Sequence, residues 1–108
     1  MGDFEAKTDW ETFAGRMFSL LMAEHRASAA FVTNFHGLVL ASRGDVPPKM
    51  PKPDRSQLAT GPIAARLDNG TVAASGQVGA NAILWGIFPT NVTEGFALAA
   101  IQAILLIL

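Results

Sequence analysis

The sequence contains no cysteine, so neither disulfides nor thiolate metal sites hold this fold together. Histidine is almost as scarce. His25 and His36 are the only two, and neither has a histidine or an acidic residue four positions further on, where a helix would bring two metal ligands together. We therefore expect no metal site and no cofactor. His25 is better explained as a favourable positive charge at the end of a helix.

Charge is also in short supply. Charged residues make up 16% of the chain, below the roughly 25% usual for soluble domains, and the net charge is -1. Beyond Asp68 the only charged residue is Glu94. A chain with so weak a field does not attract phosphate backbones, so no nucleic-acid partner is expected. So few charges leave much apolar surface to be covered, which favours an oligomer or another large interface over a monomer.

No pattern typical of catalysis is present in the sequence. The serines at positions 19, 28, 42, 56 and 75 lie in no nucleophile elbow, and no acidic residue is placed to form a triad with either histidine. Gly76 and Gly79 lack the lysine and the strand-to-helix context of a phosphate-binding loop, and we interpret both as residues that bracket a turn. The chain is therefore predicted not to be an enzyme.

The two ends of the chain bear on its location. Residues 1–12 include several acidic side chains and no apolar run, which argues against a secretory signal peptide and predicts a cytoplasmic protein. The apolar run from Phe96 to Leu108 is about 20 Å long as a helix, whereas the hydrocarbon core of a bilayer is about 30 Å thick. It is too short to span, so any membrane contact is expected to be indirect.

The first half of the chain predicts a helix followed by a β-hairpin. We expect residues 1–8 to be a flexible N-terminus and residues 9–108 a single domain. Thr8 and Glu11 form a capping-box pattern that predicts a helix over residues 9–25. Residues 28–34 and 38–42 are β-prone, and Gly37 between them supplies the positive φ that a tight hairpin needs.

The middle of the chain is rich in proline. Pro47, Pro48, Pro51 and Pro53 predict an extended loop over residues 43–53, and the PxxP spacing of residues 48–51 is interpreted as part of that loop. Asp54 and Gln57 predict a second helix start, which Gly61-Pro62 ends within two turns. An alternative is that this helix continues through Ala65.

Three further strands and a closing helix are predicted. Asn69-Gly70 is a strong hairpin signal between strands at residues 63–67 and 71–75. The apolar run 82–88 indicates a buried central strand, and Thr93 is the expected cap of a helix that runs to the end. The two tryptophans, Trp10 and Trp85, stand at core spacing, so packing is favoured over a pair that stacks on a ligand.

This order of elements and several local runs resemble the roadblock/dynein light chain family. The run Ala29 to Ser42 is similar to that family's first hairpin, with a polar turn that ends in glycine and then Leu-Val-Leu-Ala-Ser. Asp68-Asn69-Gly70, the strand from Asn81 to Phe88, and Gly95 with its apolar closing helix are similar to its second half. The resemblance covers about residues 9–108. It implies an α+β fold: a five-stranded antiparallel sheet with helices on its faces.

The chain departs from that family in one respect. The family's middle helix is usually longer and helps to build a dimer, whereas Gly61-Pro62 cuts it here. A second resemblance is to profilins, through Trp10 to Ala14 and the shared order of elements. Profilins typically have an aromatic residue where this chain has Leu40, and their last helix has a polar face, so both features argue for the roadblock resemblance.

The roadblock resemblance implies a non-enzymatic interaction module. Such a module dimerises with itself or with a paralogous subunit, and it binds or regulates a small Ras-like GTPase or serves as a scaffold subunit of a motor or signalling complex. The alternatives are a profilin-like actin-monomer binder and a small-molecule sensor. The closing helix is expected to present Ile101, Leu105 and Leu108 on one stripe and Ala103, Ile104 and Ile107 on the neighbouring one, with one stripe on the sheet and the other on a partner. The predicted partner-binding residues are Ile63, Leu67, Val72, Ile101, Ile104, Leu105 and Leu108.

Overall fold

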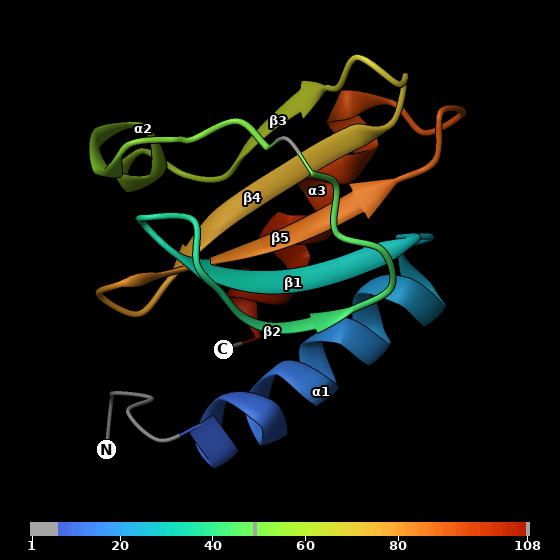
Figure 1. Ribbon diagram of the computed structural model, residues 1–108. Coiled ribbons are helices and arrows are strands. Elements are labelled where there is room, and N and C mark those ends of the chain that lie inside the picture. Colours follow the sequence, from blue (N-terminus) through green and yellow to red (C-terminus); the bar gives the residue numbers. More distant parts are fainter. Residues whose placement is uncertain (1–6, 49, 108) are drawn as a thin grey trace.

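The structure is a computed structural model that describes residues 7–48 and 50–107 (Figure 1). Within these two ranges the chain forms three helices and five strands. Their order and bounds are α1 (Lys7–Glu24), β1 (Ala29–Asn34), β2 (Val39–Arg43), α2 (Arg55–Ala59), β3 (Ile63–Arg66), β4 (Val72–Val78), β5 (Ala82–Phe88) and α3 (Glu94–Leu106).

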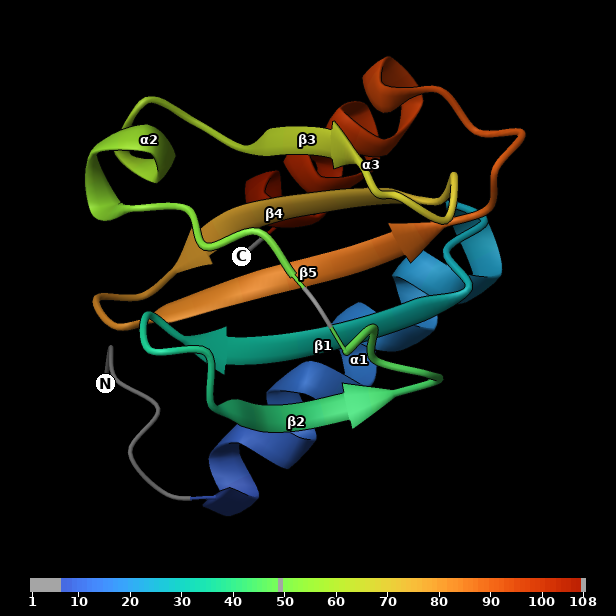
Figure 2. The ribbon, with the colours of Figure 1, turned by 45° about the horizontal axis from the view of Figure 1, so that its top comes forward.

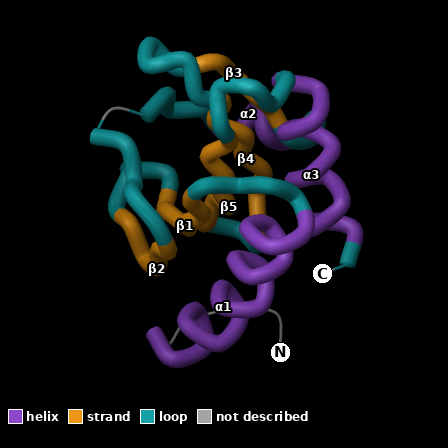
Figure 3. The backbone as a smooth tube through the Cα atoms, turned by 90° about the vertical axis from the view of Figure 1, so that its right-hand side faces the viewer, coloured by secondary structure: helices purple, strands orange, loops and turns teal. Residues whose placement is uncertain are grey.

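The strands form one sheet in the order β2-β1-β5-β4-β3, and every neighbouring pair is antiparallel. Helices α1 and α3 lie side by side on one face, and the segment that follows β2 crosses the other face with α2 (Figures 2 and 3). We call these the helix face and the strap face, and we call residues 44–53, apart from residue 49, the strap. The predicted α+β fold and its order of elements are confirmed.

Several local predictions are also confirmed. Gly37 turns the first hairpin with φ +90°, and Gly70 turns the β3–β4 hairpin with φ +89°. The Asp54 side chain accepts a hydrogen bond from the Gln57 backbone N–H, and the Gln57 side chain accepts one from the Asp54 backbone N–H, so the capping box of α2 is present. Thr93 caps α3 in the predicted way.

Other predictions about single elements are wrong. Helix α1 begins at Lys7, so Thr8 lies inside the helix and is not its cap. The alternative of a helix through Ala65 is also wrong, because Gly61, at φ +131°, and Pro62 end α2 and β3 begins at Ile63. The predicted flexible N-terminus, residues 1–8, falls largely outside the described residues and stays a prediction.

Gly76 is the clearest local error, because it lies inside β4 and not at a turn; only Gly79 is a turn residue, with φ +68°. A Cβ atom at position 76 would stand 2.6 Å from Leu105 Cδ1 and 3.1 Å from Ile101 Cγ2. On the next strand, a Cβ at Gly86 would stand 2.9 Å from a ring carbon of Phe88. Glycine in these strands therefore leaves room for the side chains of α3 and Phe88 to approach the sheet closely.

The alternation of side chains along each strand builds two cores. Val32, Leu84 and Phe88 point to the helix face, where they pack with Met17 and Leu21 of α1 and with the buried side of α3. Their neighbours along the same strands point to the strap face and form a second cluster. Its buried members are Ala29, Phe31, Leu58, Ala73, Ile83, Trp85 and Ile87, with Phe35, Val46, Met50, Ile63 and Leu67 packed around them.

One arginine ties the far end of the sheet to α3. The Arg66 guanidinium donates to the carbonyl oxygens of Gly70, Thr90 and Val92 and to Glu94 Oε1, the last at 2.7 Å. These partners lie in the β3–β4 turn, the loop after β5 and the first turn of α3. A single planar donor group therefore fixes where α3 starts relative to the edge of the sheet.

Candidate functional site

The exposed side chains of α3 are mostly apolar beyond Glu94 in its first turn, although Gln102 is exposed among them and the Arg26 guanidinium lies 6.0 Å from the centre of the Phe96 ring. Phe96, Leu106 and Ile107 have exposed fractions of 41%, 75% and 66%, and Leu98 is exposed beside them. The inward side consists of Ala97, Ala100, Ile101 and Ile104, all buried. The predicted division into stripes is therefore wrong: Ile101 and Ile104 are three residues apart and share the buried side, while Ile107 is exposed.

The predicted partner-binding residues divide between the two cores. Val72, Ile101 and Ile104 are fully buried on the helix face, and Leu105 is half-buried against the same cluster. Ile63 and Leu67 are half-buried on the strap face, and Leu108 lies outside the described residues. The structure brings four of the seven together and places Ile63 and Leu67 apart from them. Whether any of them contacts a partner stays a prediction.

Besides the exposed side of α3, the two edge strands of the sheet are surfaces to which a partner can bind. Among residues 7–48 and 50–107, strands β2 and β3 each pair with a neighbour on one side only. Beside β2, Leu38 is exposed to 62%, and Val39 within it to 41%. An edge strand presents unpaired N–H and C=O groups, on which another chain can add a strand.

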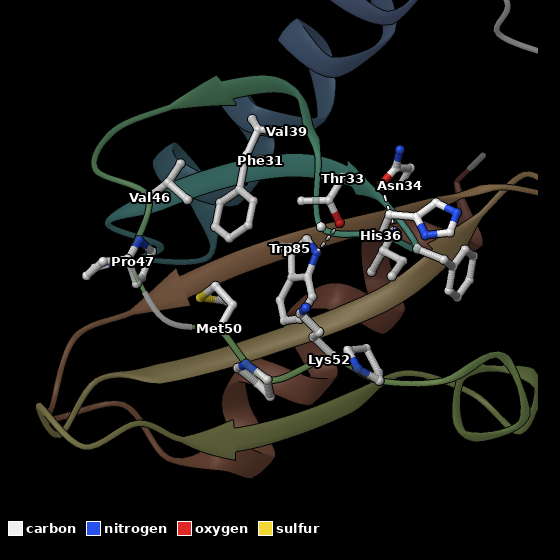
Figure 4. A pocket seen from close by; sticks show the side chains of 16 residues that line it. Phe31, Thr33, Asn34, His36, Val39, Val46, Pro47, Met50, Lys52 and Trp85 are labelled. Atoms are coloured by element: carbon white, nitrogen blue, oxygen red, sulfur yellow. Dashed lines mark hydrogen bonds between the residues drawn. The ribbon is translucent and has the colours of Figure 1, made fainter.

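The strap face also carries a hollow of about 370 Å³, which sequence reasoning missed (Figure 4). Sixteen residues from β1, the β1–β2 turn, β2, the strap and β5 line it. They are Phe31, Thr33, Asn34, Phe35, His36, Gly37, Val39, Val46, Pro47, Pro48, Met50, Pro51, Lys52, Pro53, Ile83 and Trp85. The sequence contained two signals for it: the proline cluster, which predicts a segment that needs few backbone hydrogen-bond partners, and Trp85, which the small-molecule-sensor alternative placed at a ligand.

Trp85 and Phe31 form the inner wall of this hollow. Their rings are stacked, with centroids 5.7 Å apart and planes 10° apart, and Trp85 is only 4% exposed. The indole N–H of Trp85 donates to Thr33 Oγ1 at 2.9 Å, so this buried polar group is satisfied. Trp85 packs in a core as predicted. The side chain of Trp10 lies outside the described residues, so its packing stays a prediction.

Among the side chains that the structure describes, two carboxyl groups have a shifted pKa, and both have structural partners. A hydrogen bond from the Ser56 hydroxyl, followed by the backbone N–H of Gln57, lowers the pKa of Asp54. The Arg66 guanidinium lowers the pKa of Glu94 by hydrogen bonding and by its charge. Each group caps or begins a helix, so these shifts belong to the fold.

Metal-ligating side chains do not gather within the described ranges. No group of three or more His, Asp or Glu residues there is placed to hold a metal ion. His36 stands in the β1–β2 turn, held by a hydrogen bond from its backbone N–H to Asn34 Oδ1, and His25 follows the end of α1. Across residues 7–48 and 50–107, no helix has both the length and the apolar character needed to cross a membrane.

Comparison with known proteins identifies the fold. No family model matches the chain, and no curated protein matches it significantly. Among solved structures, the chain is similar to the gliding protein MglB from Thermus thermophilus, with a TM-score of 0.56 and 17% sequence identity. The match covers 94% of this chain and 93% of MglB. The roadblock-type fold implied by the sequence resemblance is therefore confirmed, and the chain shares the fold of MglB over almost its whole length.

Proposed function

We propose that this protein is a non-enzymatic interaction module that dimerises and binds or regulates a small Ras-like GTPase in the cytoplasm. The observation that supports it most is the full-length fold match, because it agrees with the family that the local sequence runs resemble. The exposed apolar residues at the edge of β2 and on α3 also fit a protein that works by presenting surface. If the protein is instead a scaffold subunit of a larger complex, the same exposed residues of β2 and α3 are the surfaces that it presents.

The proposed dimer is tested by mass. The chain has a mass of 11.4 kDa, and static light scattering at micromolar concentration should give about twice that value. Leu106→Glu on α3 and Leu38→Asp beside β2 change exposed side chains, so each should leave the fold intact. The variant that reduces the mass to that of one chain identifies which surface dimerises. A wild-type mass of one chain at high concentration contradicts the dimer.

The proposed partner is tested by co-purification and by nucleotide hydrolysis. The GTPase to use is one encoded beside the gene for this chain, in its GTP-analogue and GDP forms. Preferential co-elution with one form supports the proposal, because regulation requires different affinities for the two states. A changed hydrolysis rate on addition of this chain distinguishes regulation from scaffolding. If this chain binds neither the GTP-analogue form nor the GDP form of the GTPase but does bind actin, the profilin-like alternative is favoured.

A further inference from the structure

The hollow on the strap face has the size of a small-molecule site. Its volume of about 370 Å³ lies within the range of ligand pockets, about 300–1,000 Å³, and is more than twice a cavity of about 150 Å³ that accommodates benzene. It is bounded by the sheet on one side and by the strap on the other. A molecule of one or two rings is the size that it fits.

The walls are apolar and the polar groups lie in a few places, which is the usual composition of a ligand site. Val46, Pro47 and Met50 supply aliphatic and sulfur surface on the strap side of the hollow, and Val39 lines it on the β2 side. The four prolines of the lining have no backbone N–H, so this wall has no amide donors at these positions that must be desolvated when a ligand enters.

Two polar side chains that line the hollow, Lys52 and Asn34, carry hydrogen-bond donors. Lys52 is exposed, and Figure 4 shows its side chain extending toward Trp85. At the other end, Asn34 Oδ1 accepts from the backbone N–H groups of His36 and Leu38, which leaves the amide nitrogen of Asn34 as a donor. No acidic residue lines the hollow, and the one ion pair within the described ranges is Arg66–Glu94, so no carboxylate there pairs with Lys52.

We propose that this hollow binds a small organic anion: a flat apolar body of one or two rings that bears a carboxylate. The body occupies the space between Met50, Val46 and the edge of Trp85, and the carboxylate faces Lys52. Charge complementarity selects the anion, because the lining contains a cation and donors but no acidic side chain. This proposal does not depend on the proposed GTPase partner.

The test is a titration followed by nitrogen–proton NMR with two matched probes. The anionic probe is 2-naphthoate, and 2-naphthamide has the same rings without the charge. Naphthoate should bind with a Kd of about 1 mM or tighter, the value that affinity per atom gives for a ligand of this size. It should shift the indole N–H signal of Trp85 and the amide signals of His36 and Gly37, whereas the backbone amide signals of Met17 and Leu21 on the helix face serve as an internal reference.

Two variants decide the role of the charge. Lys52→Gln should weaken naphthoate binding about two- to fivefold, as expected for one partly exposed ion pair, and should leave naphthamide binding unchanged. The control is Arg16→Gln, which removes an exposed cation from α1 on the other side of the sheet and should affect neither probe. Both changes lie on the surface, and retained dispersion of the NMR spectrum shows that each variant is folded.

Three results would overturn the proposal. The first is no saturable binding of naphthoate below about 10 mM, roughly tenfold weaker than expected. The second is naphthamide binding as tight as naphthoate binding, which removes the anion preference. The third is a set of shifts centred on Leu106 and Ile107, which would place the probe on the exposed side of α3 and not in the hollow. None of these results changes the expected outcome of the mass or GTPase experiments.

Discussion

The two faces of the sheet are covered by different kinds of structure, although the same strands supply both. On the helix face, α1 and α3 satisfy their own backbone groups internally and bring a continuous set of apolar side chains against Val32, Leu84 and Phe88. On the strap face, Phe31, Trp85 and Ile87 lie under a proline-rich segment and a helix of five residues. A sheet face can therefore be closed without a long helix if the covering chain has few donors to satisfy.

Because the two faces are covered differently, we expect them to contribute differently to stability and to binding. The helix-face core is close-packed: at Gly76 and Gly86, neighbouring side chains already occupy the space that a Cβ atom would need. The strap face contains the hollow and depends on scattered contacts from Val46, Met50 and Leu58. We expect the helix face to contribute most of the free energy of unfolding and the strap face to accommodate binding.

The largest effect is expected inside α3. Ile101→Glu places a charge among fully buried apolar side chains at a cost of several kcal/mol, comparable to the whole stability of a small domain, so this variant should not fold. Leu106→Glu, five residues further on, changes an exposed side chain and should remain folded. Circular dichroism of both variants checks this pair. A folded Ile101→Glu variant would show that α3 does not pack as described.

A pair of cavity variants compares the two faces directly. Ile104→Ala on the helix face and Leu58→Ala on the strap face each truncate a buried side chain, for which about 2–5 kcal/mol is usual. The cost depends on how well the site can collapse. We expect Ile104→Ala near the upper end, because α3 is anchored along its length, and Leu58→Ala near the lower end, because α2 has only five residues.

Urea unfolding at constant pH measures both changes in the free energy of unfolding. Equal values for the two variants would contradict the idea that the strap face relaxes more easily. Val39→Ala, which shortens a half-exposed residue at the rim of the hollow, is a useful reference and should have little effect.

The sequence predicted the architecture well because its signals are local. The Asp54–Gln57 capping box, the Asn69-Gly70 turn and the apolar run 82–88 each identify an element from neighbouring residues alone. What it did not predict depends on contacts between elements. Gly76 was read as a turn residue because only the approach of Ile101 and Leu105 explains a glycine inside a strand. The candidate site was less predictable.

Two features of the surface show why. The buried and exposed sides of α3 are nearly equal in hydrophobicity, so no polar face marked which side lies on the sheet, and the stripes were assigned wrongly. The hollow needs residues from β1, the strap and β5, which are up to 54 positions apart in the chain, from Phe31 to Trp85. No spacing rule connects such residues before the strand order is known.

A moderate effect is expected from the buried polar pair on the strap face. Thr33→Val keeps the shape of the side chain but removes the oxygen that accepts the Trp85 indole N–H, so a buried donor loses its partner. The usual cost of such a group is about 1–3 kcal/mol. Trp85→Phe removes the donor but also shortens a buried ring, so the double variant should lose less stability than the sum of the two single variants. Urea unfolding of the set checks the pairing, and an additive double variant would argue against it.

The smallest effect is expected from the ion pair between Arg66 and Glu94, because both side chains are partly exposed. Arg66 lowers the pKa of Glu94 in the folded state. The stabilisation is therefore fully present above the carboxyl's ordinary pKa of about 4.3 and is lost as the pH falls through the lowered, folded-state value. Glu94→Gln should therefore reduce Tm slightly at pH 7. It should not reduce Tm at a pH below the lowered pKa of Glu94, where this carboxyl is protonated in the wild type as well.

The matched control is Glu24→Gln, which removes an exposed carboxylate near the end of α1 that is not among the hydrogen-bond partners of Arg66. Thermal unfolding of the wild type and both variants at pH 7 and pH 3 gives the comparison. The Tm difference between wild type and Glu94→Gln should shrink as the pH falls, because protonation of Glu94 removes the same interaction that the substitution removes. A difference that stays constant with pH would mean that Arg66 positions α3 through the carbonyl oxygens of Gly70, Thr90 and Val92 and not through this carboxylate.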